Sequence, residues 1–211
     1  MGDTRWTVHT SDGLTLAVRR TGTRGRPVLV AVHGYPDDAS VWDEVSALLV
    51  DDFDIVAYDI RGAGASSRPR ALRAYRLEQL AADLRCVIDE VSPAAPVHLL
   101  AHDWGSVQAF YALRRNRVRV ASYTSISGPD LDATGAWMRS LAGGGPAGWA
   151  RLGRQLASSA YIGAFLLPGP IELAVRRGRV ERQVAADPSR RGMPVQRADL
   201  LDGLRLYRAN L

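Results

Sequence analysis

The sequence predicts an α/β protein in which a mostly parallel sheet is covered by helices and followed by a helical subdomain. Val28–Val32 is a continuous apolar run of strand length, and further buried strands are expected at Asp54–Ile60 and Val97–Ala101, with a helical pattern after each. Strands that are apolar on both faces are typical of parallel sheets lying between helices. After residue 128 the strand signals stop, and helical patterns interrupted by Gly and Pro continue to Leu211.

The chain opens with a predicted β-hairpin. Trp6–His9 and Leu14–Arg19 read as short strands on either side of Ser11–Gly13, whose residue types favour a turn. The first buried strand then leads into the loop His33–Asp38. Ser40 is expected to cap the next helix, in which apolar residues recur at helical spacing.

The β-α alternation continues through the middle of the chain. Tyr75–Val91 carries Leu, Ile and Val at helical spacing, so an amphipathic helix is expected there. A helix over Gly105–Arg115 follows the third buried strand, and Val120–Ile126 reads as a further strand with an unpaired outer edge. In doubly wound sheets, functional sites gather at the carboxyl ends of the strands.

The composition indicates a soluble globular chain. Of its 211 residues 46% are hydrophobic, which allows a sizeable core. Arginine supplies all 27 basic residues, and the net charge of +5 is spread along the chain, as on a solvated surface rather than a nucleic-acid or membrane patch. No stretch approaches the ~18 apolar residues of a membrane span, and no leader pattern opens the chain, so a cytoplasmic location is expected.

Cys86 is the only cysteine, which excludes an intrachain disulfide and a cysteine metal cluster. We also expect no metal and no cofactor. The expected partner is a small molecule, with no nucleic acid and no membrane span, and the sequence does not predict an oligomeric state.

Asp103 stands at the sharpest turn that the sequence predicts, between a buried strand and a helix. The small residues Ala101, Gly105 and Ser106 allow the backbone to fold tightly around it. A residue at such an apex is held toward a cleft, close to the free N–H groups of a helix N-terminus. Asp directly before a helix is also a common N-cap. The turn alone therefore leaves two interpretations, a helix cap or a nucleophile.

Motifs at three strand ends favour the nucleophile over the helix N-cap. They read His-Gly-Tyr-Pro at 33–36, Asp-Ile-Arg-Gly-Ala-Gly at 59–64 and His-Asp-Trp-Gly at 102–105. In this order they resemble the α/β-hydrolase fold family, specifically its epoxide hydrolase branch. The resemblance covers essentially the whole chain. It implies an α/β-hydrolase core over residues 1–129 and a helical cap over 130–211, with the last core strands missing.

The resemblance also implies roles at the elbow. Asp103 would be the nucleophile, whose carboxylate attacks an epoxide carbon and forms a covalent alkyl-enzyme ester. The backbone N–H groups of Tyr35 and Trp104 would form the oxyanion hole. His33 and Pro36 are expected to shape that loop and the substrate-binding surface beside it, rather than to perform chemistry.

Two tyrosines of the helical part complete the implied site. The segments around Tyr161 and Tyr207 are similar to those that carry the two cap tyrosines of epoxide hydrolases. A phenol is protonated at neutral pH and can donate to the alkoxide that forms as the epoxide opens. The expected substrate is therefore a small epoxide, and detoxification is the expected setting.

Other interpretations stay open at this point. Haloalkane dehalogenases also place Trp after the nucleophilic Asp, and there the Trp104 indole would hold a halide. Asp130 stands where some dehalogenases have their acid. The family's order is nucleophile, cap, acid and histidine, and this chain reaches Leu211 before the last two. We therefore expect an ester that does not turn over, from a piece of a longer protein or a truncated gene, or a non-catalytic binding module.

Overall fold

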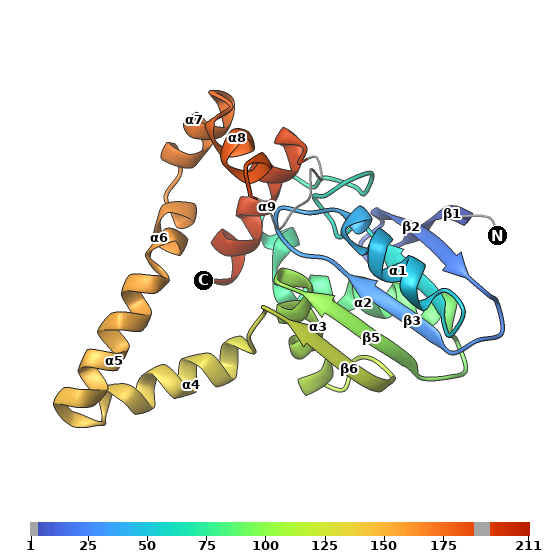
Figure 1. Ribbon diagram of the computed structural model, residues 1–211, viewed down its shortest axis with the longest axis horizontal. Helices are drawn as coiled ribbons and strands as arrows, with labels where there is room; N and C mark the ends of the chain where they lie inside the picture. The colour runs from blue at the N-terminus through green and yellow to red at the C-terminus, as the bar shows by residue number, and fades with distance from the viewer. Residues whose placement is uncertain (1–3, 188–194) are drawn as a thin grey trace.

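The structure, a computed structural model, describes residues 4–187 and 195–211. Six strands form one sheet in the order β1-β2-β4-β3-β5-β6. The hairpin β1–β2 and the pair β2–β4 are antiparallel, whereas β3, β4, β5 and β6 run parallel (Figure 1). The predicted hairpin and the mostly parallel sheet are confirmed. The strands are β1 (Thr4–His9), β2 (Thr15–Gly22), β3 (Val28–Val32), β4 (Asp54–Tyr58), β5 (Val97–His102) and β6 (Val120–Ile126).

The central strands are buried on both faces because their side chains alternate between two cores. On β3, Leu29 and Ala31 contact the core under the first helix, whereas Val30 and Val32 lie in the larger core on the opposite face. The elements that cover these two faces are η1 (Ala39–Trp42) and α1 (Asp43–Leu49) on one side, and η2 (Leu72–Tyr75), α2 (Leu77–Val91) and α3 (Trp104–Arg114) on the other.

Two predicted helix starts are corrected. Ser40 does not cap its helix, because the Asp38 side chain accepts a hydrogen bond from the Ser40 N–H at 2.8 Å and itself occupies the N-cap of η1. Tyr75 belongs to the 3-10 turn η2, and α2 begins two residues later, at Leu77. Both differences lie at helix ends, where neighbouring turn residues compete for the cap.

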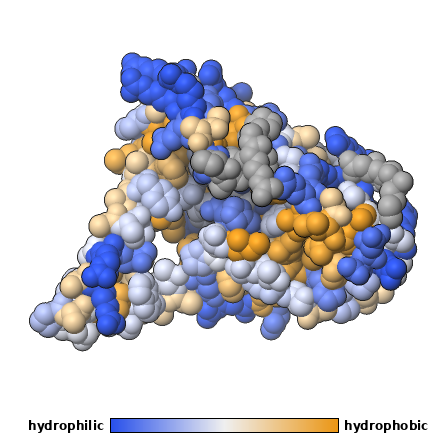
Figure 2. Space-filling model, viewed as in Figure 1, coloured by the Kyte–Doolittle hydropathy of each residue, from blue (hydrophilic) through white to orange (hydrophobic). Residues whose placement is uncertain are grey.

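Helices alone follow β6 in the parts of residues 127–211 that the structure describes. In Figure 1, α4 and α5 extend away from the sheet, and α6 to α8 lead back toward it. The space-filling view shows that side chains do not fill the gap between α5 and the sheet (Figure 2). In α4 and α5 only Gly148 is buried. The helices are α4 (Leu131–Ala142), α5 (Gly145–Ser158), α6 (Ala160–Leu166), α7 (Pro170–Arg176), α8 (Arg179–Ala185) and α9 (Arg197–Asn210).

The last helix, α9, returns to the core and is fixed there by polar contacts. Arg68, from the loop after β4, binds the carboxylates of Asp199 and Asp202 at 2.5 and 3.0 Å. Gly203 lies against the ring of Tyr35 so closely that any Cβ would overlap the ring. Asn210 accepts a hydrogen bond from the N–H of Leu77 at 2.9 Å and thus satisfies the first turn of α2.

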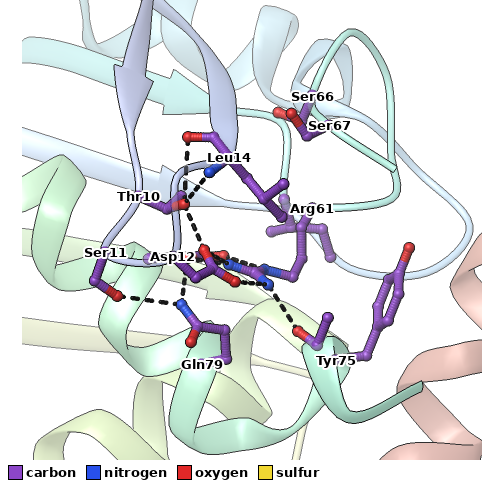
Figure 3. A network of polar contacts seen from close by, with 12 residues as sticks. Thr10, Ser11, Asp12, Leu14, Arg61, Ser66, Ser67, Tyr75 and Gln79 are labelled. Atoms are coloured by element: carbon purple, nitrogen blue, oxygen red, sulfur yellow. Dashed lines mark hydrogen bonds and ion pairs between the residues drawn. The ribbon is translucent and has the colours of Figure 1, made fainter. Parts of the chain in front are cut away.

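A buried arginine joins the hairpin to the helical layer. Arg61 has a fully buried side chain and binds Asp83 of α2 at 2.6 and 2.7 Å. It also binds Asp12 of the hairpin turn through two contacts of 3.0 Å (Figure 3) and the carbonyl of Ala74 at 2.9 Å. The guanidinium is therefore paired on every side, which fixes the loop after β4. Within the described residues, no helix has both the length and the apolar character needed to cross a bilayer.

Candidate active site

Asp103 lies at the apex of the turn between β5 and α3. Its backbone has φ 51° and ψ −122°, a conformation that non-glycine residues rarely adopt and that costs about 1–3 kcal/mol. Although Asp103 occupies the N-cap position of α3, its side chain makes no capping hydrogen bond. The cap interpretation therefore does not explain the residue, since the side chain of an N-cap Asp would accept from the N–H of the second or third residue of its helix.

The Asp103 carboxylate is held by backbone groups from two loops. Oδ1 accepts a hydrogen bond from the N–H of Tyr35 at 2.7 Å. The backbone N–H of Trp104 also acts on the carboxylate and lowers its pKa. Gly34 makes this approach possible, because a Cβ there would overlap Asp103 Oδ1 and the Trp104 nitrogen. The arrangement has the form of an oxyanion hole, in which one backbone N–H already points at a carboxylate oxygen and a second acts on the same group.

Burial and hydrogen bonding act in opposite directions on Asp103. Burial raises the pKa of its carboxyl above the ordinary value, and the charge of Asp37 adds to this. The N–H groups of Trp104 and Tyr35 and the charge of His102 lower the pKa in part. The net result is a raised pKa, which describes a carboxylate that is poorly hydrated and correspondingly reactive.

Tyr207 comes from α9 and packs over the elbow. Its ring meets those of Trp104 and Tyr35 edge to face, with centroids 5.0 and 5.6 Å apart, and the ring of Phe165 at 4.9 Å. Burial raises the pKa of the Tyr207 hydroxyl, and the negative charge of Asp103 raises it further. The phenol therefore keeps its proton at neutral pH.

Tyr161 lies farther out. Its side chain is 57% exposed, and its ring contacts Phe165 with centroids 5.6 Å apart. The structure thus brings Asp103, the Tyr35 and Trp104 N–H groups and Tyr207 together, and links Tyr161 to them through the ring of Phe165. Sequence reasoning missed Phe165. The signal available was its position four residues after Tyr161, on the same face of a helix.

His33 lies behind the loop rather than in front of Asp103. Its ring is fully buried, with Nε2 3.0 Å from the N–H of Ile60 and Nδ1 2.9 Å from the carbonyl of Gly34. His33 thus connects the loop after β3 with the loop after β4.

The comparisons with known proteins give the family. Residues 27–157, more than half of the chain, match the alpha/beta hydrolase fold family. The chain belongs to the α/β-hydrolase fold family.

Individual relatives of this α/β-hydrolase are named after oxidoreductase and epoxide hydrolase activities. It is 49% identical over 127 residues to "Probable oxidoreductase EphD" of Mycobacterium tuberculosis, a match that covers 59% of the chain and 22% of that protein. It is 37% identical over 122 residues to "Epoxide hydrolase A" of the same species, covering 57% of the chain and 38% of that protein. The chain thus spans less than two thirds of the length of these relatives.

Solved structures with the same fold superpose on nearly the whole length of this chain. An epoxide hydrolase from hot-environment metagenomes superposes with a TM-score of 0.74 at 24% identity, over 100% of this chain and 71% of that one. Epoxide hydrolase A of Mycobacterium thermoresistibile superposes with a TM-score of 0.69 at 23% identity, over 98% and 74%. These matches confirm the predicted fold.

The remaining histidines of this α/β-hydrolase are placed elsewhere. His98 bonds the Ser122 hydroxyl at 2.7 Å on the neighbouring strand, and His9 lies on the outermost strand β1. None of the four histidines makes a hydrogen bond to Asp103 in the described part of the chain. Asp130 caps α4 and binds Arg114 at 2.7 Å, so its carboxylate is engaged in structure.

Proposed function

We propose that this chain carries out the first half of epoxide hydrolysis, with Asp103 as the nucleophile. The observation that carries the proposal is the 2.7 Å hydrogen bond from the Tyr35 N–H to Oδ1 of a carboxylate at a strained apex. With Oδ1 held in this way, Oδ2 is the oxygen that reacts. An ionised carboxylate needs no base to attack an sp³ carbon, unlike a serine hydroxyl.

In the proposed step, Asp103 Oδ2 forms a bond to an epoxide carbon as the bond from that carbon to the ring oxygen breaks. The electron pair passes to the ring oxygen, which takes a proton from the Tyr207 hydroxyl. Tyr161 assists at the outer side of the site, and solvent returns the proton to the tyrosinate. The products are an alkyl ester of Asp103 and a neutral β-hydroxyl group.

The relatives support an epoxide as the substrate class, since several of them are named epoxide hydrolases. The position of Trp104 also favours an epoxide over a haloalkane. Its indole packs edge to face against the Tyr207 ring with centroids 5.0 Å apart, so it supports the proposed acid rather than a halide.

Hydrolysis of the ester needs a base to activate water, and no hydrogen bond joins a histidine to Asp103 among the described residues. The proposal for this chain therefore stops at the ester. It requires no metal or cofactor, and residues 130–211 act as the cap that supplies the acids.

Intact-mass spectrometry after incubation with styrene oxide tests the proposal. We expect one adduct of the epoxide's mass, located on Asp103 by peptide mapping. Asp103→Asn should abolish it, whereas the control Asp130→Asn should retain it. A folded sample that stays unmodified, or that is modified elsewhere, would contradict the proposal and favour a non-catalytic binding module. Release of bromide from 1-bromobutane would instead favour a dehalogenase.

Replacing the proposed acid separates its role from that of the nucleophile. In Tyr207→Phe the adduct should form about 100-fold more slowly, because a positioned general acid contributes roughly that factor. Tyr161→Phe should have a smaller effect, since its side chain is 57% exposed. Equal rates in Tyr207→Phe and the unchanged protein would remove Tyr207 from the mechanism.

A further inference from the structure

The peptide unit whose N–H bonds Asp103 also has a hydrogen-bond partner at its carbonyl end. Gly34 and Tyr35 share this peptide: its N–H donates to Asp103 Oδ1 at 2.7 Å, and its carbonyl lies 2.9 Å from His33 Nδ1. When the carbonyl of a peptide accepts a hydrogen bond, its N–H becomes a stronger donor, because bonds in a chain polarise one another. His33 is therefore placed to act on the carboxylate through the intervening peptide.

Ile60 determines which nitrogen of His33 carries the proton. The Ile60 N–H can only donate, and it lies 3.0 Å from Nε2, so Nε2 accepts. The proton of the neutral ring is then on Nδ1, facing the Gly34 carbonyl, which can only accept. The ring receives one hydrogen bond and donates the next in the direction of Asp103.

The hydrogen bonds that lead to Ile60 have the same donor-to-acceptor direction and begin at β2. The peptide that supplies the Ile60 N–H has the Asp59 carbonyl at its other end, and this carbonyl accepts a hydrogen bond from the Ser66 hydroxyl at 2.6 Å. Ser66 in turn accepts one from the N–H of Ala17 at 2.8 Å. A buried chain of hydrogen bonds with one direction thus ends on the Asp103 carboxylate.

We propose that His33 is a positioning residue that, as its Nδ1–H tautomer, orients and polarises the Gly34–Tyr35 peptide so that the Tyr35 N–H fixes Asp103 Oδ1. This inference rests on the proposed function of Asp103 as nucleophile. It extends that function by a residue that touches neither substrate nor the reacting atoms. It also gives the histidine of the His-Gly-Tyr-Pro segment a directional role in addition to its packing.

Two substitutions separate the two hydrogen bonds of His33. In His33→Asn the side-chain amide reaches the position of Nδ1 and can still donate to the Gly34 carbonyl, but the acceptor for Ile60 is lost. In His33→Gln the amide oxygen reaches the position of Nε2 and can still accept from Ile60, but the donor to Gly34 is lost. Both remove the ring from a buried site, so a purely structural role predicts similar effects.

The primary readout is the chemical shift of the Tyr35 amide proton at neutral pH in ¹⁵N-labelled protein, which needs no epoxide. We expect a strongly downfield proton in the unchanged protein, moved upfield in His33→Gln and in the reference variant Asp103→Asn, and retained in His33→Asn. The second readout is the rate of adduct formation with styrene oxide. It should fall about tenfold or more in His33→Gln and about threefold or less in His33→Asn.

The outcomes separate this inference from the proposed function. An unchanged Tyr35 amide in His33→Gln, or equal losses in both His33 variants, overturns the positioning role. If styrene oxide forms no adduct with the unchanged protein, the amide shift still decides the inference while the proposed function fails. Should both variants unfold, Ser66→Ala interrupts the chain upstream. A smaller upfield shift of Tyr35 then supports the inference, and no shift overturns it.

Discussion

At Asp103, the features that favour reactivity lower the stability of the folded protein. The residue has a backbone conformation that its side chain disfavours, and it carries a poorly hydrated charge. Two backbone N–H groups compensate for part of that cost. Strain and buried charge at one residue are typical of sites where reactivity rather than stability is favoured.

Asp103→Asn should stabilise the protein at neutral pH by about 1 kcal/mol. Because the folded-state pKa of Asp103 is raised, its ionisation opposes folding from the ordinary value of 3.8 upward, and fully above the raised pKa. Asn has the same shape and can still accept from Tyr35, but it carries no charge. The gain should be full above the raised pKa and vanish as the pH falls to the ordinary value of 3.8. Thermal unfolding at pH 7 and pH 4 measures it, and a gain independent of pH would contradict the argument.

At the scale of the elements, the strands and most helices follow from the sequence because their apolar patterns are local. Asp103, with small residues around it, could be found in the same way. The contacts that hold α9 could not, because they join distant parts of the chain: Asn210 satisfies the N–H of Leu77, 133 residues away. Nor could the sequence place Tyr207 inside the aromatic cluster and leave Tyr161 at its rim, since both look alike on their helices.

Gly203→Ala tests how α9 docks. The added methyl group would overlap the Tyr35 ring, so the helix must shift, at a cost of about 1–3 kcal/mol. Adduct formation should slow as Tyr207 moves. Gly153→Ala is the matched control: it lies within α5, where a Cβ meets nothing within 4 Å, and it should stabilise the helix by about 0.5–1 kcal/mol. Urea unfolding measures both, and equal effects of the two substitutions would argue against the docking contact.

Asp83→Asn tests the buried ion pairs that join the hairpin to α2. Arg61 would keep a buried positive charge with one of its carboxylate partners removed, which costs about 3 kcal/mol or more. Asp12→Asn should cost less, because the Asp12 side chain is 34% exposed and water can replace part of the interaction. Chemical denaturation of the two variants gives the comparison, and a larger loss in Asp12→Asn would reverse this assignment.

At the scale of the whole molecule, the two ends of the sheet differ. The edge strand β1 carries Arg5 and pairs with β2, whereas the edge strand β6 carries no charged residue and pairs with β5 alone among the described residues. Much of β6 is exposed, including 41% of Ile126. A strand with free N–H and C=O groups and few charges on its exposed side chains is a template for pairing with another chain. The helices α4 and α5 leave this side uncovered (Figure 1).

We therefore expect the chain to self-associate slowly at high concentration through β6, and Thr124→Lys to slow this association at least severalfold. Thr124 lies at the middle of the exposed edge strand, where a lysine is the charge that natural edge strands use against pairing. Ala94→Lys adds the same charge in an exposed loop before β5 and should change the rate little. Light scattering and thioflavin T fluorescence over time measure the association. Equal protection by both lysines would assign the effect to net charge and not to the strand edge.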